Sequence, residues 1–540
     1  MRLSYHVDLM TRHVYCPIMP LDLELVKEGD TGIHVNGGNV AERAIVENIL
    51  RFSRQDVFLF PRQAITSIGD LRRTRWVNAA GNRVRFVNSL ELMRGALSRD
   101  MILFSPAWGM DHLVTLRDSI GRKTIPLVSV SHSLCSPSVM AHFKLLYLSG
   151  MRSHDSFVVP STAGHIALLK MWAHAGESVA SQTDPSQLEC PLFRVIPHGI
   201  DEEYFSGSAS SNTDHVRFLY FGRFSTQSKA DLVPLLVAWA SLKKKIANIS
   251  LKIAGDDTQQ KSAERLREVA MQLGCGDSVE VITNPTKRQK HEMYHEADVF
   301  LSPSDSLQET FGLTLLEAMA AGLPVIVSDW SGYKDIVEEG NTGFLIPTIF
   351  PAMPPARSSQ FSEPFLSDIS AVATSVDVGC LVDRMFLLAT RGDLRRSLGD
   401  QGRRKAAEQY GWKRIVEMYD DLFDHLREES KRFQDRESKT RANAISPSTV
   451  FSHYPTMNLQ ETMRVSRKDG GQREYVLSLA CHGYPDAAAL VKTLESIPRT
   501  AISVRELCSL MEIKAGVERR EVFLHVGRLM KYDLIVYLEQ

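Results

Sequence analysis

The stretch DVFLSPSDSLQETFGLTLLEAMAAGLPVIVSD, residues 298–329, contains one complete structural unit. Two short apolar runs, DVFLSPS and PVIVSD, flank residues 313–321, which have the composition of a helix that Gly322 stops. Apolar β-branched runs that alternate with helical segments are typical of βαβ units, in which a helix joins two parallel strands. The stretch therefore predicts a parallel α/β sheet.

The same alternation extends along the chain in two series. The first consists of DVFLF (56–60), MILFS (101–105), IPLVSVS (125–131) and DSFVVPS (155–161). The second, spread over 193–348, consists of FRVIP, RFLYFG, SLKIAG, SVEVIT, DVFLSPS, PVIVSD and GFLIPT. These runs are apolar at both alternating positions, as expected for strands that helices cover on both faces. The sequence predicts an α/β protein with two open sheets, divided within the Ser-, Gln- and Asp-rich stretch 176–191.

We expect four segments along the chain. Residues 1–185 form an N-terminal α/β domain and residues 186–430 a second one. A charged linker, 431–454, leads to a small domain at 455–540. In that last segment Ser503-x-x-Glu506 is a capping box that opens a helix, and Val522, Val526 and Leu529 stripe another helix before the final strand DLIVYLE. The order helix, helix, strand resembles a winged-helix unit.

Composition excludes several classes of protein. Of 540 residues 44% are hydrophobic and 24% charged, with 63 Lys+Arg against 64 Asp+Glu and a net charge of -1. This balance argues against a protein whose main task is to bind nucleic acid or an acidic membrane surface, because both require a basic field. The seven Cys are scattered without a Cys-x-x-Cys pair, which disfavours a disulfide framework and a structural zinc site. No signal peptide and no transmembrane stretch is apparent, so we expect a cytoplasmic protein.

The loop before residue 313 has the features of a phosphate site. Gly312 ends a loop that follows a strand, and a helix begins directly after it, so free N–H groups and a positive dipole end lie beside the carboxyl end of the sheet. Glu309 lies on that loop and Glu317 one turn into the helix. Two carboxylates near a phosphate suit a ligand that also carries sugar hydroxyls, which indicates a sugar nucleotide. Alternatively, the two are surface carboxylates of an amphipathic helix.

Two cations fit the same ligand. Arg223 follows Gly222 at a strand end, where its guanidinium can bind a diphosphate with two hydrogen bonds. Lys229 adds a compact charge, and together they offset about two negative charges on a departing nucleotide. Either residue alone is more often a solvated surface cation, and it is their spacing and context that favour the functional interpretation.

Taken together, these motifs resemble family 4 glycosyltransferases of the GT-B fold. Glu309-x7-Glu317 resembles the family's donor-site signature, and YFGRFSTQSK (220–229) its Gly-Arg-x5-Lys phosphate motif. FRVIPHGID (193–201), LKIAGDD (251–257), HEADVFLSPS and GNTGFLIP continue the pattern, which covers roughly 32–426. The resemblance implies two Rossmann-like domains facing a cleft, with the helix near 412–426 crossing back onto the N-terminal domain.

The resemblance also implies roles for individual residues. Transfer would occur with retention of anomeric configuration, a leaving phosphate oxygen would take the acceptor proton, Glu317 would hold the ribose and Glu309 the donor sugar. The catalytic set would be Arg223, Lys229, Glu309 and His132, the last just past the strand VSVS, although a structural role for His132 is nearly as well supported. Donor binding would further involve Gly37, Gly38, Gly222, Gly255, Phe311, Gly312, Leu313 and Glu317.

The N-terminal domain should recognise the acceptor, and Trp108 and Asp111, after another strand, are candidate contacts. The chain contains no Asp-x-Asp triplet, so we expect neither a bound metal nor a cofactor, with a nucleotide-diphosphate sugar as the donor. Because the 455–540 segment lacks a basic stripe, DNA binding is disfavoured there, and we expect docking to a protein or peptide, or self-association.

The sequence thus favours a metal-independent, retaining glycosyltransferase whose acceptor is unknown, whether a sugar, a lipid-linked sugar, a small molecule or a peptide. Two alternatives remain. The chain could catalyse another reaction of the GT-B fold, such as epimerisation or phosphorolysis, although no pyridoxal-phosphate lysine is recognisable. It could also sense a nucleotide sugar and recruit partners without catalysis.

Overall fold

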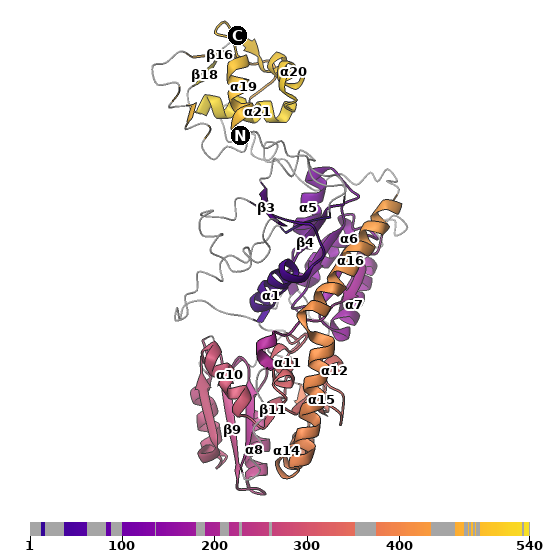
Figure 1. The fold of residues 1–540 in the computed structure, drawn as a ribbon, viewed down its shortest axis with the longest axis vertical. Helices are drawn as coiled ribbons and strands as arrows, with labels where there is room; N and C mark the ends of the chain where they lie inside the picture. Colours follow the sequence, from indigo (N-terminus) through magenta and orange to yellow (C-terminus); the bar gives the residue numbers. More distant parts are fainter. Residues whose placement is uncertain are drawn as a thin grey trace. The chain divides into compact units, whose positions relative to one another are not determined.

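A computed structural model of the chain describes residues 12–16, 37–61, 83–87, 100–135, 137–179, 189–205, 215–225, 229–258, 262–350, 374–433, 459–468, 474, 477–478, 481, 486–531 and 534–538. The chain divides into two compact units, Met1–Asn443 and Ala444–Gln540. The first unit holds two large parallel sheets and the second a small antiparallel one (Figure 1).

The N-terminal sheet has seven parallel strands in the order β3-β2-β1-β4-β5-β6-β7. Their bounds are β1 His13–Tyr15, β2 Val57–Pro61, β3 Val84–Val87, β4 Ile102–Ser105, β5 Leu127–Val130, β6 Ser156–Val159 and β7 Leu192–Val195. Alternate side chains form two cores. One face packs against α1 (Gly37–Phe52), and the other against α5 (Met110–Ile120), α6 (Pro137–Leu148) and α7 (Thr162–Val179).

Two strands of this sheet differ from the sequence-based expectation. The run containing Phe193 was predicted to belong to the second sheet, and this is wrong, because β7 pairs with β6 in parallel, Phe193 opposite Phe157. An apolar run can join the edge of either sheet, and periodicity alone does not distinguish the two. The central strand β1, only three residues long, falls outside both predicted series.

The C-terminal sheet has six parallel strands in the order β10-β9-β8-β11-β12-β13. Their bounds are β8 Val216–Phe221, β9 Ile249–Gly255, β10 Val279–Thr283, β11 Val299–Ser302, β12 Val325–Ser328 and β13 Gly343–Ile346. One face packs against α8 (Val233–Lys243), α9 (Ala263–Gln272) and α14 (Val378–Thr390), and the other against α10 (Lys287–Glu296), α11 (Leu313–Ala320), α12 (Tyr333–Ile336) and α15 (Gly392–Tyr410). The predicted pair of helix-covered parallel sheets is confirmed. Two single-turn 3-10 segments, Glu202–Phe205 and Gly276–Ser278, and the hairpin of β14 (Thr348–Ile349) with β15 (Ser375–Val376) complete this domain.

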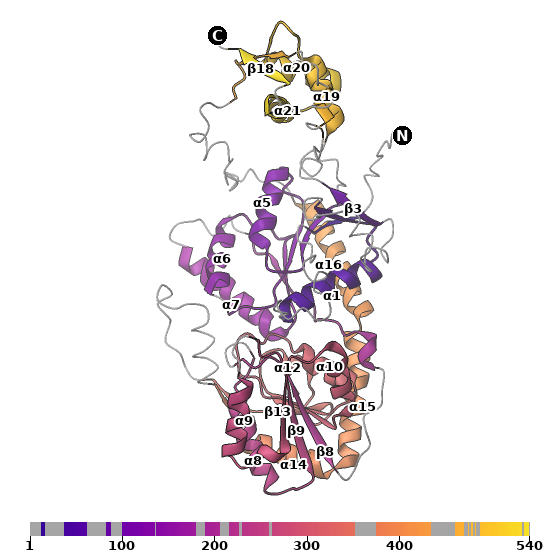
Figure 2. The ribbon, with the colours of Figure 1, turned by 90° about the vertical axis from the view of Figure 1, so that its left-hand side faces the viewer.

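The long helix α16 (Trp412–Arg432) follows the C-terminal domain in sequence but packs on the N-terminal sheet (Figures 1 and 2). Its apolar stripe joins the core that also contains Ile45, Phe58 and Phe104, with Phe104 edge-on to the rings of Tyr419 and Phe423. Where the chain crosses between domains its two passages lie side by side, since the Ile200 N–H donates to the Tyr410 carbonyl at 2.8 Å.

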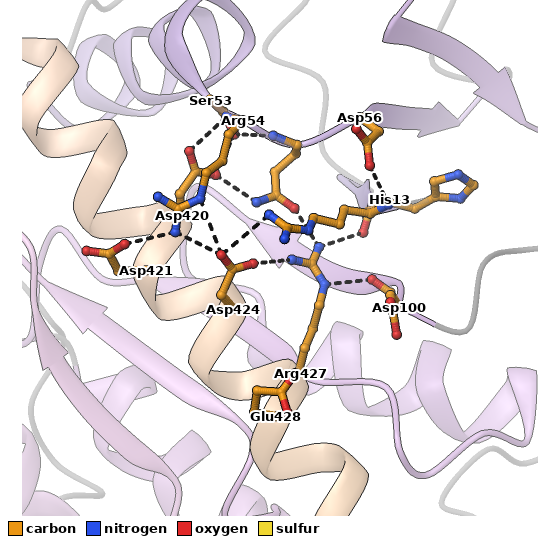
Figure 3. Close-up of polar contacts among 12 residues, drawn as sticks. His13, Ser53, Arg54, Asp56, Asp100, Asp420, Asp421, Asp424, Arg427 and Glu428 are labelled. Atoms are coloured by element: carbon orange, nitrogen blue, oxygen red, sulfur yellow. Dashed lines mark hydrogen bonds and ion pairs between the residues drawn. The ribbon is translucent and has the colours of Figure 1, made fainter. Parts of the chain in front are cut away.

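Polar contacts fix α16 in place (Figure 3). The buried carboxylate of Asp420 accepts from the Ser53 hydroxyl at 2.6 Å, the Arg54 backbone N–H at 2.9 Å and the Gln55 amide at 2.8 Å. Arg427, also buried, donates to the Asp100 carbonyl at 2.8 Å and to the Gln55 side-chain oxygen at 2.6 Å. Ser53, Arg54, Gln55 and Asp100 all belong to the N-terminal domain, so α16 is structurally a part of that domain.

The second unit is a small α/β fold with its own core. Its described elements are β16 Arg464–Arg467, α19 Ala487–Ser496, β17 Ile502–Ser503, α20 Val504–Ala515, α21 Arg519–Lys531 and β18 Ile535–Leu538, with the antiparallel sheet order β17-β16-β18. The capping box of Ser503 and Glu506 opens α20, and Val522, Val526 and Leu529 are fully buried. The order of the last three elements is the expected one, while assignment to the winged-helix class stays a prediction.

In the part of the chain that the structure describes, no helix combines the length and the apolar character needed to span a bilayer.

Candidate functional site

A cavity of about 580 Å³ lies at the carboxyl edge of the C-terminal sheet. Adjacent strands β8 and β11 form the point where strand order reverses, because β9 and β10 extend to one side and β12 and β13 to the other. The loops that follow β8 and β11 diverge there and leave a crevice, the usual ligand position in open α/β sheets. The N-terminal domain supplies the opposite wall, through Val40, Glu42, His132, Ser133 and His198.

Lys229 and Glu309 form a buried ion pair in this cavity. Their side chains are 9% and 11% exposed, and the Lys229 ammonium donates to the Glu309 carboxylate. Burial by itself would lower the pKa of Lys229, but the adjacent Glu309 carboxylate outweighs that effect and raises the pKa. The Tyr333 hydroxyl lies 3.3 Å from the Lys229 ammonium and 2.7 Å from the Ser302 hydroxyl. The two predicted catalytic residues therefore hold each other in place.

Arg223 lines the cavity directly after Gly222. The Tyr220 hydroxyl donates to the Arg223 carbonyl at 3.4 Å and so tethers this loop. Gly255, predicted to bind the donor, contributes differently: it is not one of the described residues that line the cavity, and a Cβ there would lie 1.6 Å from the Gly222 carbonyl oxygen. Only glycine lets β9 approach the β8 loop so closely, so Gly255 acts as a support for Gly222 and Arg223.

Gly312 caps the start of α11 with φ 114°, a conformation that favours glycine. A Cβ there would also come within 2.5 Å of the Tyr333 ring. Phe311 and Leu313 flank it on the cavity wall, and the Phe311 N–H donates to Glu309 at 3.4 Å. The first N–H groups of a helix have no partner within the helix, so the start of α11 presents donors to this cavity.

Glu317 is held from α10, a contact that the sequence analysis missed. One carboxylate oxygen accepts from the Lys290 ammonium at 2.7 Å and the other from the Tyr294 hydroxyl at 3.0 Å. A carboxylate has about four acceptor positions, so Glu317 can still accept from ligand hydroxyls. The signal was present, because Lys290 and Tyr294 lie four residues apart and so share one helix face.

His132 and His198 stack at the back of the cavity, with ring centroids 5.3 Å apart. Sequence reasoning missed His198. Burial and the neighbouring His132 lower the pKa of His198 well below its ordinary value. His132 Nε2 lies 2.7 Å from the Pro106 carbonyl, which can only accept, so Nε2 carries the hydrogen. Burial lowers the pKa of His132, and its Nδ1 is buried with no hydrogen-bond partner among the described residues. Nδ1 is thus an acceptor suited to a ligand hydroxyl.

Gly37 and Gly38 form the first residues of α1, and the next turn of that helix places Val40 and Glu42 on the cavity wall. Burial raises the pKa of Glu42 to about 7. The two candidate acceptor contacts lie elsewhere. Trp108 stacks on Phe157 within the N-terminal core, centroids 5.6 Å apart, and Asp111 is exposed in the first turn of α5.

No cluster of three or more His, Cys, Asp or Glu side chains within the described ranges could hold a metal ion. The positive groups at the cavity are instead Arg223, Lys229, Lys290 and the start of α11. With Glu309, Glu317 and His132 as acceptors, the cavity combines donors for a phosphate-rich ligand with acceptors for hydroxyls.

Comparison with known proteins agrees with this chemistry. The model of the family "Glycosyl transferases group 1" matches residues 201–349, which include Arg223, Lys229, Glu309 and Glu317. The match lies within the C-terminal domain and covers the part of the cavity that this domain supplies.

Among curated relatives, a GDP-mannose:cellobiosyl-diphosphopolyprenol alpha-mannosyltransferase of Xanthomonas oryzae is 29% identical over 171 residues, 32% of this chain and 42% of that protein. A lipopolysaccharide 1,2-N-acetylglucosaminetransferase of Salmonella typhimurium is 24% identical over 257 residues, 44% of this chain and 57% of that protein. The chain thus spans about half the length of these relatives. A glycosyltransferase crystal structure from Rickettsia africae shares the GT-B fold, with a TM-score of 0.51 and 13% identity over 77% of this chain and 99% of that one.

Proposed function

We propose that the chain transfers a sugar from a nucleotide-diphosphate sugar to an acceptor hydroxyl, with retention of anomeric configuration and without a metal ion. The observation that carries this proposal is the convergence of Arg223, the Lys229–Glu309 pair and the start of α11 on one cavity that His132 faces from the other domain.

Each group has a role in the proposed reaction. Arg223 and Lys229 stabilise charge on the departing diphosphate, and N–H groups at the start of α11 bind its oxygens. Glu317, held by Lys290 and Tyr294, accepts hydrogen bonds from the ribose hydroxyls. Glu309 and His132 Nδ1 accept from hydroxyls of the donor sugar. As the bond from the sugar to the diphosphate breaks, a phosphate oxygen takes the proton of the acceptor hydroxyl, so no side-chain base is assigned.

The names of the relatives set the order in which donors are tested. Mannosyl and N-acetylglucosaminyl transferases are among them, so GDP-mannose and UDP-N-acetylglucosamine come first. Incubation with each sugar nucleotide and a panel of acceptors should release nucleoside diphosphate, and chelation of metals with EDTA should leave the rate unchanged. The anomeric configuration of the product, read by NMR, tests retention.

Variants test the assigned site. Arg223→Ala should remove about 2–4 kcal/mol of transition-state stabilisation, which lowers kcat roughly 30- to 1,000-fold. Glu317→Gln should mainly weaken donor binding. A matched control is Glu280→Gln on the far strand β10, where the side chain is 64% exposed, and it should change neither quantity.

The alternatives give different results. Donor binding without release of nucleoside diphosphate by any donor would favour a sensor. Conversion of the donor sugar in the absence of an acceptor would favour epimerisation. Full activity in the Arg223 variant would contradict the mechanism proposed above.

A further inference from the structure

Glu42 lines the cavity from the N-terminal domain and has no role in the reaction proposed above. It lies near the start of α1, and its side chain is half-buried. The other described residues of this wall, Val40, His132, Ser133 and His198, carry no charge at neutral pH, because burial lowers the pKa of both histidines. Among the residues that the structure describes, Glu42 is therefore the charged group of this wall.

The Glu42 carboxylate has no partner in the described part of the chain. No hydrogen bond and no cation stabilises its charge there, so burial alone acts on its pKa and raises the pKa to about 7. The other carboxylates of the cavity differ in this respect. Glu309 and Glu317 each accept from a lysine ammonium. Asp256 accepts from the Thr258 backbone N–H at 2.9 Å. A half-buried carboxylate without donors costs free energy, and at the wall of a ligand cavity we expect the ligand to supply the donors.

The packing of α1 fixes the direction of the Glu42 side chain. Ala41, Ile45 and Ile49 are almost fully buried, and the two isoleucines belong to the core that α16 closes. One residue turns a helix by about 100°, so Glu42 lies beside this apolar stripe, at the edge that faces the cavity. A rotation of α1 that moved Glu42 away would expose the stripe to water. The carboxylate is thus held at the cavity.

The two walls of the cavity differ in what they can bind. Among the described residues, the cations that suit a diphosphate, Arg223, Lys229 and Lys290, come from the C-terminal domain. The opposite wall offers hydrogen-bond acceptors instead, the Glu42 carboxylate and His132 Nδ1. A molecule that binds against the N-terminal wall should therefore carry hydrogen-bond donors and no anionic group close to Glu42.

Hydroxyl groups suit Glu42 better than an ammonium group does. With a pKa of about 7, the carboxyl is present in both its forms near neutral pH. The ionised form can accept from two hydroxyls through its two oxygens, and the protonated form can accept from one hydroxyl and donate to another. An ammonium group has donors only, so it pairs well with the ionised form alone. A phosphate or carboxylate would lie against a like charge.

We propose that Glu42 selects the acceptor. It binds an uncharged polyol, such as a sugar unit, through hydroxyls next to the one that reacts, and it rejects acceptors that carry a phosphate or a carboxylate at that position. That this polyol is the acceptor rests on the proposed function. Its binding beside Glu42 does not, and it can be measured without turnover.

Binding to the full chain in the presence of UDP or GDP tests the proposal. The probes are the methyl glycosides of glucose, galactose and mannose and those of the corresponding uronic acids, which differ by a carboxylate. At pH 8 most Glu42 is ionised. Saturation-transfer NMR should then show that at least one neutral glycoside binds about tenfold more tightly than its uronic acid. Glu42→Gln keeps the shape but removes the charge, so the two affinities should come within about twofold of each other.

Glu47→Gln is the matched control. Glu47 lies on the same helix, pairs with Arg43 at 2.7 Å and is not one of the described residues that line the cavity. This variant should keep the wild-type preference for the neutral glycoside. Both variants should bind UDP and GDP with wild-type affinity, which shows that the cavity has kept its structure.

The possible results separate this proposal from the proposed function. An unchanged preference in the Glu42 variant, equal binding of neutral and anionic glycosides by the wild type, or no binding of any neutral glycoside would overturn the role of Glu42. Sugar transfer to another class of acceptor would then leave the proposed function intact. A preference that depends on Glu42, without release of nucleoside diphosphate by any donor, would support the polyol site and remove the proposed function.

Discussion

The Lys229–Glu309 pair allows a stringent test. Removing one charge should lower both stability and activity, whereas removing both charges should restore stability but not activity. Both side chains are almost fully buried, and among the residues that the structure describes the Lys229 ammonium is the counter-ion of Glu309. Replacement by methionine, Lys229→Met, keeps the volume but leaves a buried carboxylate uncompensated. Breaking such a pair typically costs about 3–5 kcal/mol. In a domain of this size, 1 kcal/mol corresponds to about 2–4 °C, so the melting temperature should fall by about 6–20 °C.

The double variant Lys229→Met/Glu309→Gln removes both charges and should recover most of that loss, because a buried pair replaced by neutral groups of similar volume is often close to neutral in stability. Its transfer rate should stay as low as that of the single variant, since the cation is still missing. Differential scanning calorimetry measures the first quantity and release of nucleoside diphosphate the second. Arg391→Met is the control, because Arg391 and its partner Asp393 are both exposed, and this variant should not shift the melting temperature. A double variant as unstable as the single one would refute the reasoning.

Three further predictions concern support, pH and the crossing helix. Gly255→Ala should lower kcat/KM about 100-fold, because the new Cβ would lie 1.6 Å from the Gly222 carbonyl oxygen and must displace the loop after β8 by about 1 Å or more. Gly274→Ala is the control, since Gly274 also has a positive φ of 73° but faces open space, and this variant should keep the wild-type kcat/KM. Asp305 lies buried in the loop between β11 and α11, and burial raises its pKa from 3.8 to about 8. The protonated carboxyl of Asp305 thus contributes its full stability below about pH 4, and this contribution is lost as the pH rises toward 8. Asp305→Asn should flatten the decline of the melting temperature between these two pH values. A decline as steep as that of the wild type would show that Asp305 does not cause it. Asp420→Ala should destabilise the N-terminal domain by about 2–5 kcal/mol in thermal unfolding, because it removes three hydrogen bonds of a buried carboxylate. Asp421 on the same helix is 66% exposed, and Asp421→Ala should not destabilise the domain. Equal effects of the two variants would mean that the hydrogen bonds of Asp420 do not stabilise the domain.

Local patterns in the sequence predicted most of the fold. The strands from β8 to β13 each appear as an apolar run between turn residues, and α11 begins and ends at glycines. The short β1 and the edge strand β7 could not be assigned in this way, because their place depends on which sheet completes its hydrogen bonds and not on local composition. The exchange of α16 between domains could be expected only from the family resemblance.

The site was predictable as a set of residue types but not as a set of contacts. Arg223, Lys229, Glu309 and Glu317 do line one cavity. Their pairing could not be inferred from spacing, because Lys229 and Glu309 lie 80 residues apart and meet only where β8 and β11 are neighbours. Lys290 reaches the cavity from α10, which carries no recognisable motif. His198 lies within the motif FRVIPHGID, but the motif alone does not show that its side chain reaches the cavity, and the role of Gly255 depends on an approach of two backbones.

The position of α16 has a consequence for the order in which the protein can fold during synthesis. The last strand of the N-terminal sheet, β7, ends at Val195, but α16, which together with α1 covers one face of that sheet, ends only at Arg432. At about 5–20 residues per second, the ribosome needs roughly 10–50 s to make the intervening chain. Throughout that interval the apolar side chains that later contact Tyr419 and Phe423 remain open to water or to chaperones. The domain that is translated first is therefore completed only after the second domain, which has the opportunity to fold before its predecessor is finished.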